Sequence, residues 1–269
     1  MIIISPSLVL TADAQNSPCI GSDNRVLTTN IISDSANAAY PITNVANPAT
    51  NILWKSASLA AQTITIDNTA NTDLMDYLAI ARHNFGSTRC YVRLDVTDFS
   101  ASTTTVIASY QPADDKALIF RFAPQQVKTF KIYLIPTSAT VYPQAAVIYA
   151  GKLVVSPRNV YVGHTPLTLG RQTQVSNGKS ENGNFLGRIV IQESLMTGLS
   201  LMNLNAAWYR SVFDPFVVQA KEYPFFFAWR PTTYPNEVGY AWMTGDPKPS
   251  NQRPNGMMQV DLQMTGVAS

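Results

Sequence analysis

Short runs in which apolar and polar residues alternate follow one another through the first half of the chain. The clearest are QTITID at 62–67 and TFKIYLIP at 129–136, with polar or proline-containing breaks between the runs. Successive side chains of a strand point to opposite faces of a sheet, so this alternation predicts half-buried strands. Further strands are expected in DYLAIAR (76–82), CYVRLDV (90–96), TTTVIASY (103–110), ALIFRFA (117–123) and AAVIYAGKL (145–153). Strands repeated at intervals of roughly ten residues are typical of a β-sandwich or barrel.

The length of 269 residues favours two domains, because single domains usually have roughly 100 to 200 residues. We expect a mainly β protein with an extended N-terminal arm at 1–30, a jelly-roll β-sandwich at 31–155, and a β-rich α+β domain at 156–269 in which one helix packs on a sheet. The first residues, MIIISPSLVL, lack the positive start of a secretion signal, and Pro6 interrupts their apolar run. They are interpreted as an edge strand or docking arm.

The pattern changes after the segment LVVSPRNVYVGHTP (153–166), where the domain junction is placed. Polar alternating residues then flank Ser176–Asn184, which holds two Asn-Gly pairs and predicts the turn of a long hairpin. Apolar residues at helical spacing predict one helix from about Asn203 to Val212, and Pro215 limits its continuation. The runs YPFFFAWRPTTY, EVGYAWMTG and MMQVDLQMTG complete a β-rich C-terminal domain.

Aromatic residues are concentrated at 223–245, and they include Phe226, Trp229 and Tyr234. The first strand of this segment is too apolar to face water on both sides, so one face fills a core and the other needs a cover. That cover is either a second layer of the same domain or a neighbouring subunit, since the centre of a subunit interface is rich in aromatic residues and poor in charge.

Charged residues make up 13% of the chain, about half the roughly 25% of an average soluble domain. The net charge of +2 comes from scattered Lys and Arg without a basic run, which argues against a nucleic-acid partner. No apolar run reaches the roughly 20 residues of a membrane span. The chain has only two cysteines, Cys19 and Cys90, which is too few for a disulfide scaffold or a four-cysteine zinc site. Two free thiols are favoured over one disulfide between them.

No group of residues in the sequence predicts catalysis. There is no Gly-x-Ser-x-Gly elbow, no glycine-rich phosphate loop, and neither cysteine lies near a histidine in the sequence. The acidic residues are dispersed, and the adjacent Asp114 and Asp115 are interpreted as solvated turn residues. We therefore expect no catalytic residue, metal site or cofactor, and a protein that is not an enzyme.

Two places in the sandwich are candidates for ligand binding. Trp54 follows a polar loop, and its ring either plugs one end of the core or stacks on a sugar. Arg82, His83 and Asn84 follow the apolar strand YLAIA at the point where a strand meets a loop. These three side chains either bind a ligand or neighbouring subunit at the rim, or fix the loop by bonding to backbone groups.

The stretch NVANPATNILW (44–54) and the strand order after it resemble discoidin-like, or galactose-binding-like, jelly rolls. The wider pattern YPxxNxxNPxTxxxW (40–54), followed by YLAIARHNFGS (77–87) and by W-x-P-x-x-YP-x-E-V-x-Y (229–240), resembles minor tail or tail-tip proteins of long-tailed bacteriophages. These motifs mark a fold and contain no catalytic residues.

The phage resemblance implies a structural protein of the tail tip or baseplate that assembles in a homo-oligomeric ring and links the tail tube to host-recognition parts. Its partners would be other phage tail proteins, and it would be made in the host bacterial cytoplasm and end up in the virion. Asn177, Gly178 and Asn182 of the hairpin, together with the three aromatic residues named above, are the expected interface. The alternative is a carbohydrate-binding module that recognises a cell-surface glycan through Trp54 and the 82–84 loop.

Overall fold

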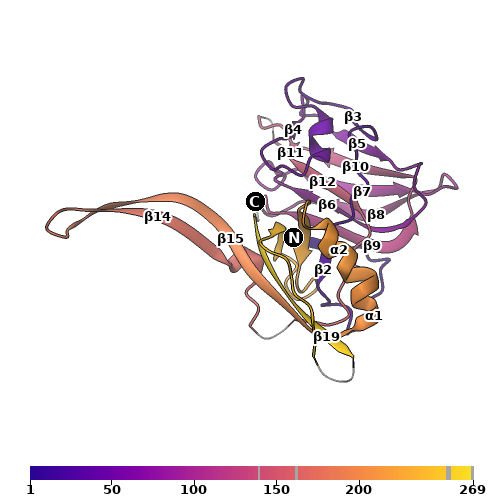
Figure 1. The fold of residues 1–269 in the computed structure, drawn as a ribbon. Helices are drawn as coiled ribbons and strands as arrows, with labels where there is room; N and C mark the ends of the chain where they lie inside the picture. Colours follow the sequence, from indigo (N-terminus) through magenta and orange to yellow (C-terminus); the bar gives the residue numbers. More distant parts are fainter. Residues whose placement is uncertain (139, 161–162, 253–255, 268–269) are drawn as a thin grey trace.

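A computed structural model describes residues 1–138, 140–160, 163–252 and 256–267. The fold is mainly β, as the sequence predicts. Two sheets form a jelly-roll-like sandwich, a third and larger sheet packs on the sandwich, and a helix lies on this third sheet (Figure 1). A long hairpin leaves the third sheet and extends away from the rest of the molecule (Figure 1). No helix in the described part of the chain is long and apolar enough to span a membrane.

The sandwich consists of a four-stranded and a five-stranded sheet. The first has the order β1 (Ile2–Ile4), β9 (Leu118–Gln126), β6 (Leu74–Ala81), β12 (Val147–Gly151). The second has the order β3 (Ile31–Ser33), β5 (Gln62–Asp67), β10 (Thr129–Ile135), β7 (Tyr91–Thr97), β8 (Thr103–Tyr110). A 3-10 turn, η1 (Ile42–Ala46), and the short pair β4 (Trp54–Lys55) and β11 (Gln144–Ala145) complete it. The strands predicted at 62–67 and 103–110 have the predicted bounds.

Strand β6 is buried on both of its faces. Leu78 and Ile80 belong to the core between the two sheets of the sandwich. Tyr77, Ala79 and Ala81 belong to a second core, between the sandwich and the third sheet. The near-continuous apolar run YLAIA therefore reflects a strand in a central layer, since a strand with one face in water would alternate.

The N-terminal segment 1–30, expected as an extended arm, is built into the body of the protein. Strand β1 is an edge strand that pairs in parallel with β9 of the sandwich. Strand β2 (Cys19–Gly21) pairs with β13 (Val154–Val155) and β16 (Phe225–Ala228) of the third sheet. The N-terminal segment therefore contributes one strand to the sandwich and one to the third sheet. Its position is set by backbone hydrogen bonds to strands distant in the sequence.

The third sheet follows the order β13, β2, β16, β17 (Val238–Met243), β19 (Met257–Val267), β15 (Phe185–Asn205), β14 (Arg171–Lys179). Strand β18 (Ser250–Asn251) pairs with β19, and the 3-10 turn η2 (Leu167–Leu169) precedes β14. The three C-terminal strands β16, β17 and β19 were all expected from the sequence.

The aromatic strand β16 is covered on both faces by this same chain. Phe225 and Phe227 face the helix, whereas Phe226 and Ala228 face the sandwich. Phe226 is fully buried and packs against Tyr149 of β12, with ring centroids 5.5 Å apart. The prediction that Phe226 lies at a subunit interface is therefore wrong, because the sandwich supplies the cover that the strand needs.

The predicted helix is present but begins and ends later than expected. It runs through α1 (Ala206–Trp208), a π-helical turn η3 (Tyr209–Phe213) and α2 (Asp214–Gln219). Asn205 caps it, since its side-chain oxygen accepts hydrogen bonds from the amides of Ala207 and Trp208. The helix continues past Pro215 because Pro215 occupies the first turn of α2, after the wider π turn, where proline is tolerated.

The hairpin arm comprises β14 and the distal part of β15, from Phe185 to about Leu195. Its turn lies at 180–184, so the first Asn-Gly pair, Asn177 and Gly178, sits inside β14 and not in the turn as predicted. Leu186 and Ile191 have no opposite partner on β14 and form two bulges in β15. Bulges bend and twist a strand, which explains the curvature of the arm in Figure 1.

Candidate functional site

The loop after β6 holds the predicted ligand-binding residues in a rigid arrangement. Arg82 is exposed and has a φ of 53°, a left-handed conformation that is uncommon for any residue other than glycine. The Asn84 side chain donates from Nδ2 to the carbonyl of Tyr142 (2.9 Å) and accepts at Oδ1 from the amide of Gln144 (2.9 Å). Asn84 therefore ties the loop to the segment before β12 and has little hydrogen-bonding capacity left for a ligand.

His83 is buried and bonded within the protein. Its Nε2 lies 2.8 Å from the carbonyl oxygen of Lys116, its Nδ1 accepts the amide of Phe85 at 3.2 Å, and its ring stacks on that of Phe85. A neutral ring that carries its proton on Nε2 satisfies both bonds. Burial accordingly lowers the pKa of His83 to about 4, although the backbone bond to Lys116 opposes this shift.

Because the pKa of His83 is lowered, we expect it to make folding sensitive to acid. The unfolded chain binds a proton near pH 6.5 and the folded chain only near pH 4, so the stability from neutral His83 is complete above pH 6.5 and is lost as the pH falls to about 4. The loss is on the order of 3 kcal/mol. The free energy of unfolding, measured with urea at pH 7 and pH 4.5, should change less with pH for His83→Gln than for the natural chain. An equal dependence in both would contradict this expectation.

The loop borders a polar pocket of about 300 Å³ at the rim of the sandwich. Arg82, His83 and Asn84 line it, and Asp115 and Gln144 join them from other segments. Asp115, interpreted from the sequence as a solvated turn residue, also accepts the amide of Ser87. Its role in the pocket was missed because only the folded chain brings the loop at 114–116 to the end of β6.

Trp54 does not line this pocket. It is fully buried in the core of the sandwich, and its indole nitrogen donates to the carbonyl of Ser35 at 3.1 Å. No face of the ring is exposed, so the geometry corresponds to the core-filling alternative for Trp54.

The predicted interface residues lie in three different environments. Asn177, Gly178 and Asn182 are exposed on the arm, and Asn177 accepts a hydrogen bond from Arg188 across the hairpin (2.8 Å). Tyr234 is also exposed and stacks on the mostly buried Trp229, with centroids 5.4 Å apart. Phe226, by contrast, is enclosed between sandwich and sheet.

The sequence reasoning missed a group of exposed apolar side chains that lie close together in the chain, along the arm. Five of them are between 52% and 71% exposed: Phe185, Leu186, Ile189, Val190 and Ile191. The run RIVIQ, with three consecutive β-branched apolar residues in a polar hairpin, was the available signal. Large apolar side chains that gather on an exposed surface often mark an interaction site.

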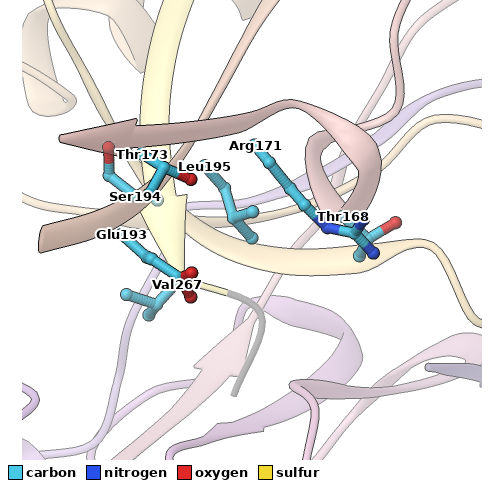
Figure 2. Close-up of a pocket in the computed structure, with 8 residues that line it drawn as sticks. Thr168, Arg171, Thr173, Glu193, Ser194, Leu195 and Val267 are labelled. Atoms are coloured by element: carbon cyan, nitrogen blue, oxygen red, sulfur yellow. The ribbon is translucent and has the colours of Figure 1, made fainter. Parts of the chain in front are cut away.

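A pocket of about 230 Å³ lies where the arm leaves the sheet (Figure 2). Arg171 and Thr173 of β14, Glu193 of β15 and Val267 of β19 are among its lining residues. Its lining combines two opposite charges with hydroxyl and apolar side chains.

Neither cysteine is suited to nucleophilic chemistry. Both are free, as favoured from the sequence, and both are buried. Burial raises the pKa of Cys19 to about 11 and that of Cys90 to about 12, so both thiols are protonated at neutral pH. Among the residues that the structure describes, no group of His, Cys, Asp and Glu could hold a metal ion.

Comparison with known proteins finds no matching family model and no matching curated protein. Several solved structures are similar to about half of the chain. A chitosan-binding module from a chitosanase/glucanase of Paenibacillus sp. IK-5 has a TM-score of 0.38 at 14% identity and covers 47% of this chain and 97% of its own. A family 32 carbohydrate-binding module from Clostridium perfringens NanJ, in complex with galactose, has a TM-score of 0.40 at 11% identity and covers 47% and 97%. A fucose-binding module from Streptococcus pneumoniae has a TM-score of 0.39 at 14% identity and covers 48% and 96%.

Proposed function

We propose that this chain is a non-catalytic structural subunit, and that its hairpin arm packs on a neighbouring subunit of a larger assembly. The observation that carries the proposal is the arm itself, a projecting two-stranded ribbon with five exposed apolar side chains. An isolated two-stranded ribbon is marginally stable in water, and three or more strands or a packing partner make it stable. An arm of this kind therefore gains stability when a neighbour covers it.

The arm and its root suggest a head-to-tail contact. The apolar surface of the arm and the pocket at its root are different surfaces of one chain, so contact between them in successive subunits is heterologous. Heterologous contacts produce rings when the rotation closes and filaments when it does not. We place this assembly in the tail tip or baseplate of a long-tailed phage on the sequence resemblance alone, with other tail proteins as partners and the virion as location.

Shortening the arm tests the proposal. Replacement of residues 176–189 by an Asn-Gly turn keeps the pair Val175 and Val190 and closes the hairpin beside it. We expect the natural chain to sediment as an oligomer and the shortened chain as a folded monomer with an unchanged circular dichroism spectrum. Val9→Asp, at a 91% exposed position outside the arm, is the matched control and should leave the oligomer intact.

The proposal fails if the natural chain stays monomeric at high concentration and in the presence of its native particles, or if the shortened chain assembles normally. Antibody labelling of whole and partly dissociated particles tests the finer placement. Label at one end of a tail agrees with a tail-tip protein, whereas label elsewhere, or on no particle, contradicts it.

A second candidate function is recognition of a cell-surface glycan by the sandwich. The specific observation is the rim pocket of about 300 Å³, in which the strained and exposed Arg82 lies with Asp115. Backbone strain of this kind is concentrated at functional sites. Three solved structures similar to about half of the chain are described as binding modules for chitosan, galactose and fucose. A glycan array probed with the intact protein tests this candidate, and Arg82→Ala should abolish any signal that arises at the rim.

A further inference from the structure

A separate pocket of about 250 Å³ lies at the junction between the sandwich and the C-terminal half. Four parts of the chain enclose it: the segment 22–27, the end of η1 with Pro48, Tyr149 of β12, and the end of α2 with Tyr223. Tyr149 is almost completely buried and Tyr223 is 48% exposed, so the lining includes both a buried and an exposed tyrosine. Junctions of this kind are a preferred location for small-molecule sites.

Several polar groups that line the pocket have unused hydrogen-bonding capacity. The Asn24 side chain accepts the amides of Val26 (3.0 Å) and Ala150 (3.4 Å) at Oδ1, whereas its Nδ2 donates to none of the described residues. Gln219 donates from Nε2 to the carbonyl of Ser22 (2.8 Å), and its Oε1 accepts from none of the described residues. An amide donor and an amide acceptor thus remain available on opposite sides of the junction.

The hydroxyl of Tyr149 adds a third group. It lies 3.4 Å from the hydroxyl of Tyr240, which donates a shorter bond of 2.9 Å to the carbonyl of Pro48. One hydroxyl has one proton to donate, so the shorter bond uses it and the Tyr149 oxygen is left with a long, weak contact. A buried polar group that is poorly bonded is costly to the fold, and a ligand hydroxyl in the pocket would relieve that cost.

The chemistry of the lining defines the ligand. No lining residue is charged, which disfavours an ionic ligand because nothing would offset its loss of hydration. The polar part offers amides and hydroxyls, and the apolar part consists of Val26, Leu27, Ala46 and Pro48. The volume lies below the roughly 300 to 1,000 Å³ of pockets for drug-sized ligands. We infer that the junction pocket binds a small, neutral molecule with several hydroxyl groups, of the size of one hexose.

Saturation-transfer NMR of the intact protein tests this inference, with galactose and glucose as probes and N-acetylneuraminic acid as a charged control. We expect a neutral hexose to bind and the acid not to bind. Tyr223→Ala and Gln219→Leu should each weaken binding about tenfold, the equivalent of one hydrogen bond or ring contact. Arg82→Ala, at the separate rim pocket, should leave hexose binding unchanged.

Tyr223 is half-exposed, so Tyr223→Ala should unfold at the same urea concentration as the natural chain. A loss of hexose binding in this variant then cannot be attributed to unfolding. The inference is overturned if neither hexose binds, or if binding survives both junction variants. Loss of hexose binding in Arg82→Ala alone would also overturn it and would locate the sugar at the rim. The arm takes no part in these measurements, so their outcome is independent of the assembly proposal.

Discussion

Replacing Phe226 by alanine is expected to lower the free energy of unfolding by about 3–5 kcal/mol. The ring is fully buried between the sandwich and the third sheet and contacts two tyrosines, Tyr149 and Tyr240, with centroids 5.5 and 4.9 Å away. Its removal leaves a cavity between two layers whose strands are held by their own ladders, so the site cannot collapse easily. Urea unfolding followed by circular dichroism measures the loss.

Two comparisons make the Phe226 result specific. Phe185→Ala removes the same ring from a 66% exposed position on the arm and, in dilute protein where the chain is monomeric, should change the free energy of unfolding by less than about 0.5 kcal/mol. The effect of Phe226→Ala should also be independent of protein concentration, because the contact lies within one chain. A loss that disappears at high concentration would instead indicate a contact between subunits and contradict the three-sheet packing.

Trp54→Ala is expected to cost about 3–5 kcal/mol through lost packing. It also removes the indole donor from the carbonyl of Ser35, which keeps the bond from the Ser33 hydroxyl (3.0 Å), so the lost hydrogen bond adds only about 0.5–1.5 kcal/mol. Trp54→Phe keeps an aromatic ring and removes the donor, so it should show the smaller part of the loss. The measurement is again urea unfolding of the intact protein.

Trp242→Ala is the matched control for Trp54, because Trp242 lies in a strand but is 40% exposed. Its replacement should cost clearly less than that of Trp54. If Trp54→Ala instead unfolds like the natural chain but loses binding to a glycan, the ring is a ligand-binding group and the core-filling interpretation is wrong.

The candidate site could be predicted only in part from the sequence. The residues Arg82–Asn84 were found because a polar trio follows an apolar strand, and the structure places all three around one pocket. The sequence could not reveal that His83 and Asn84 are bonded to the backbone of Lys116, Tyr142 and Gln144, since those partners are between 33 and 60 residues away. The same limit explains why Asp115 was assigned to a solvated turn.

What the sequence determined by itself is the local structure. Alternation at period two is a property of neighbouring residues, and it was sufficient for strands β5 and β10. The Asn-Gly pairs between polar alternating runs indicated the hairpin. The tertiary structure decided which faces are covered and by what. Period two states that Phe225 and Phe226 lie on opposite faces of β16, but only the packing of three sheets and a helix shows that one faces the helix and the other the sandwich. Burial depends on contacts between segments distant in the chain. Such contacts hold the N-terminal segment in two sheets, whereas the apolar side chains of the arm stay exposed.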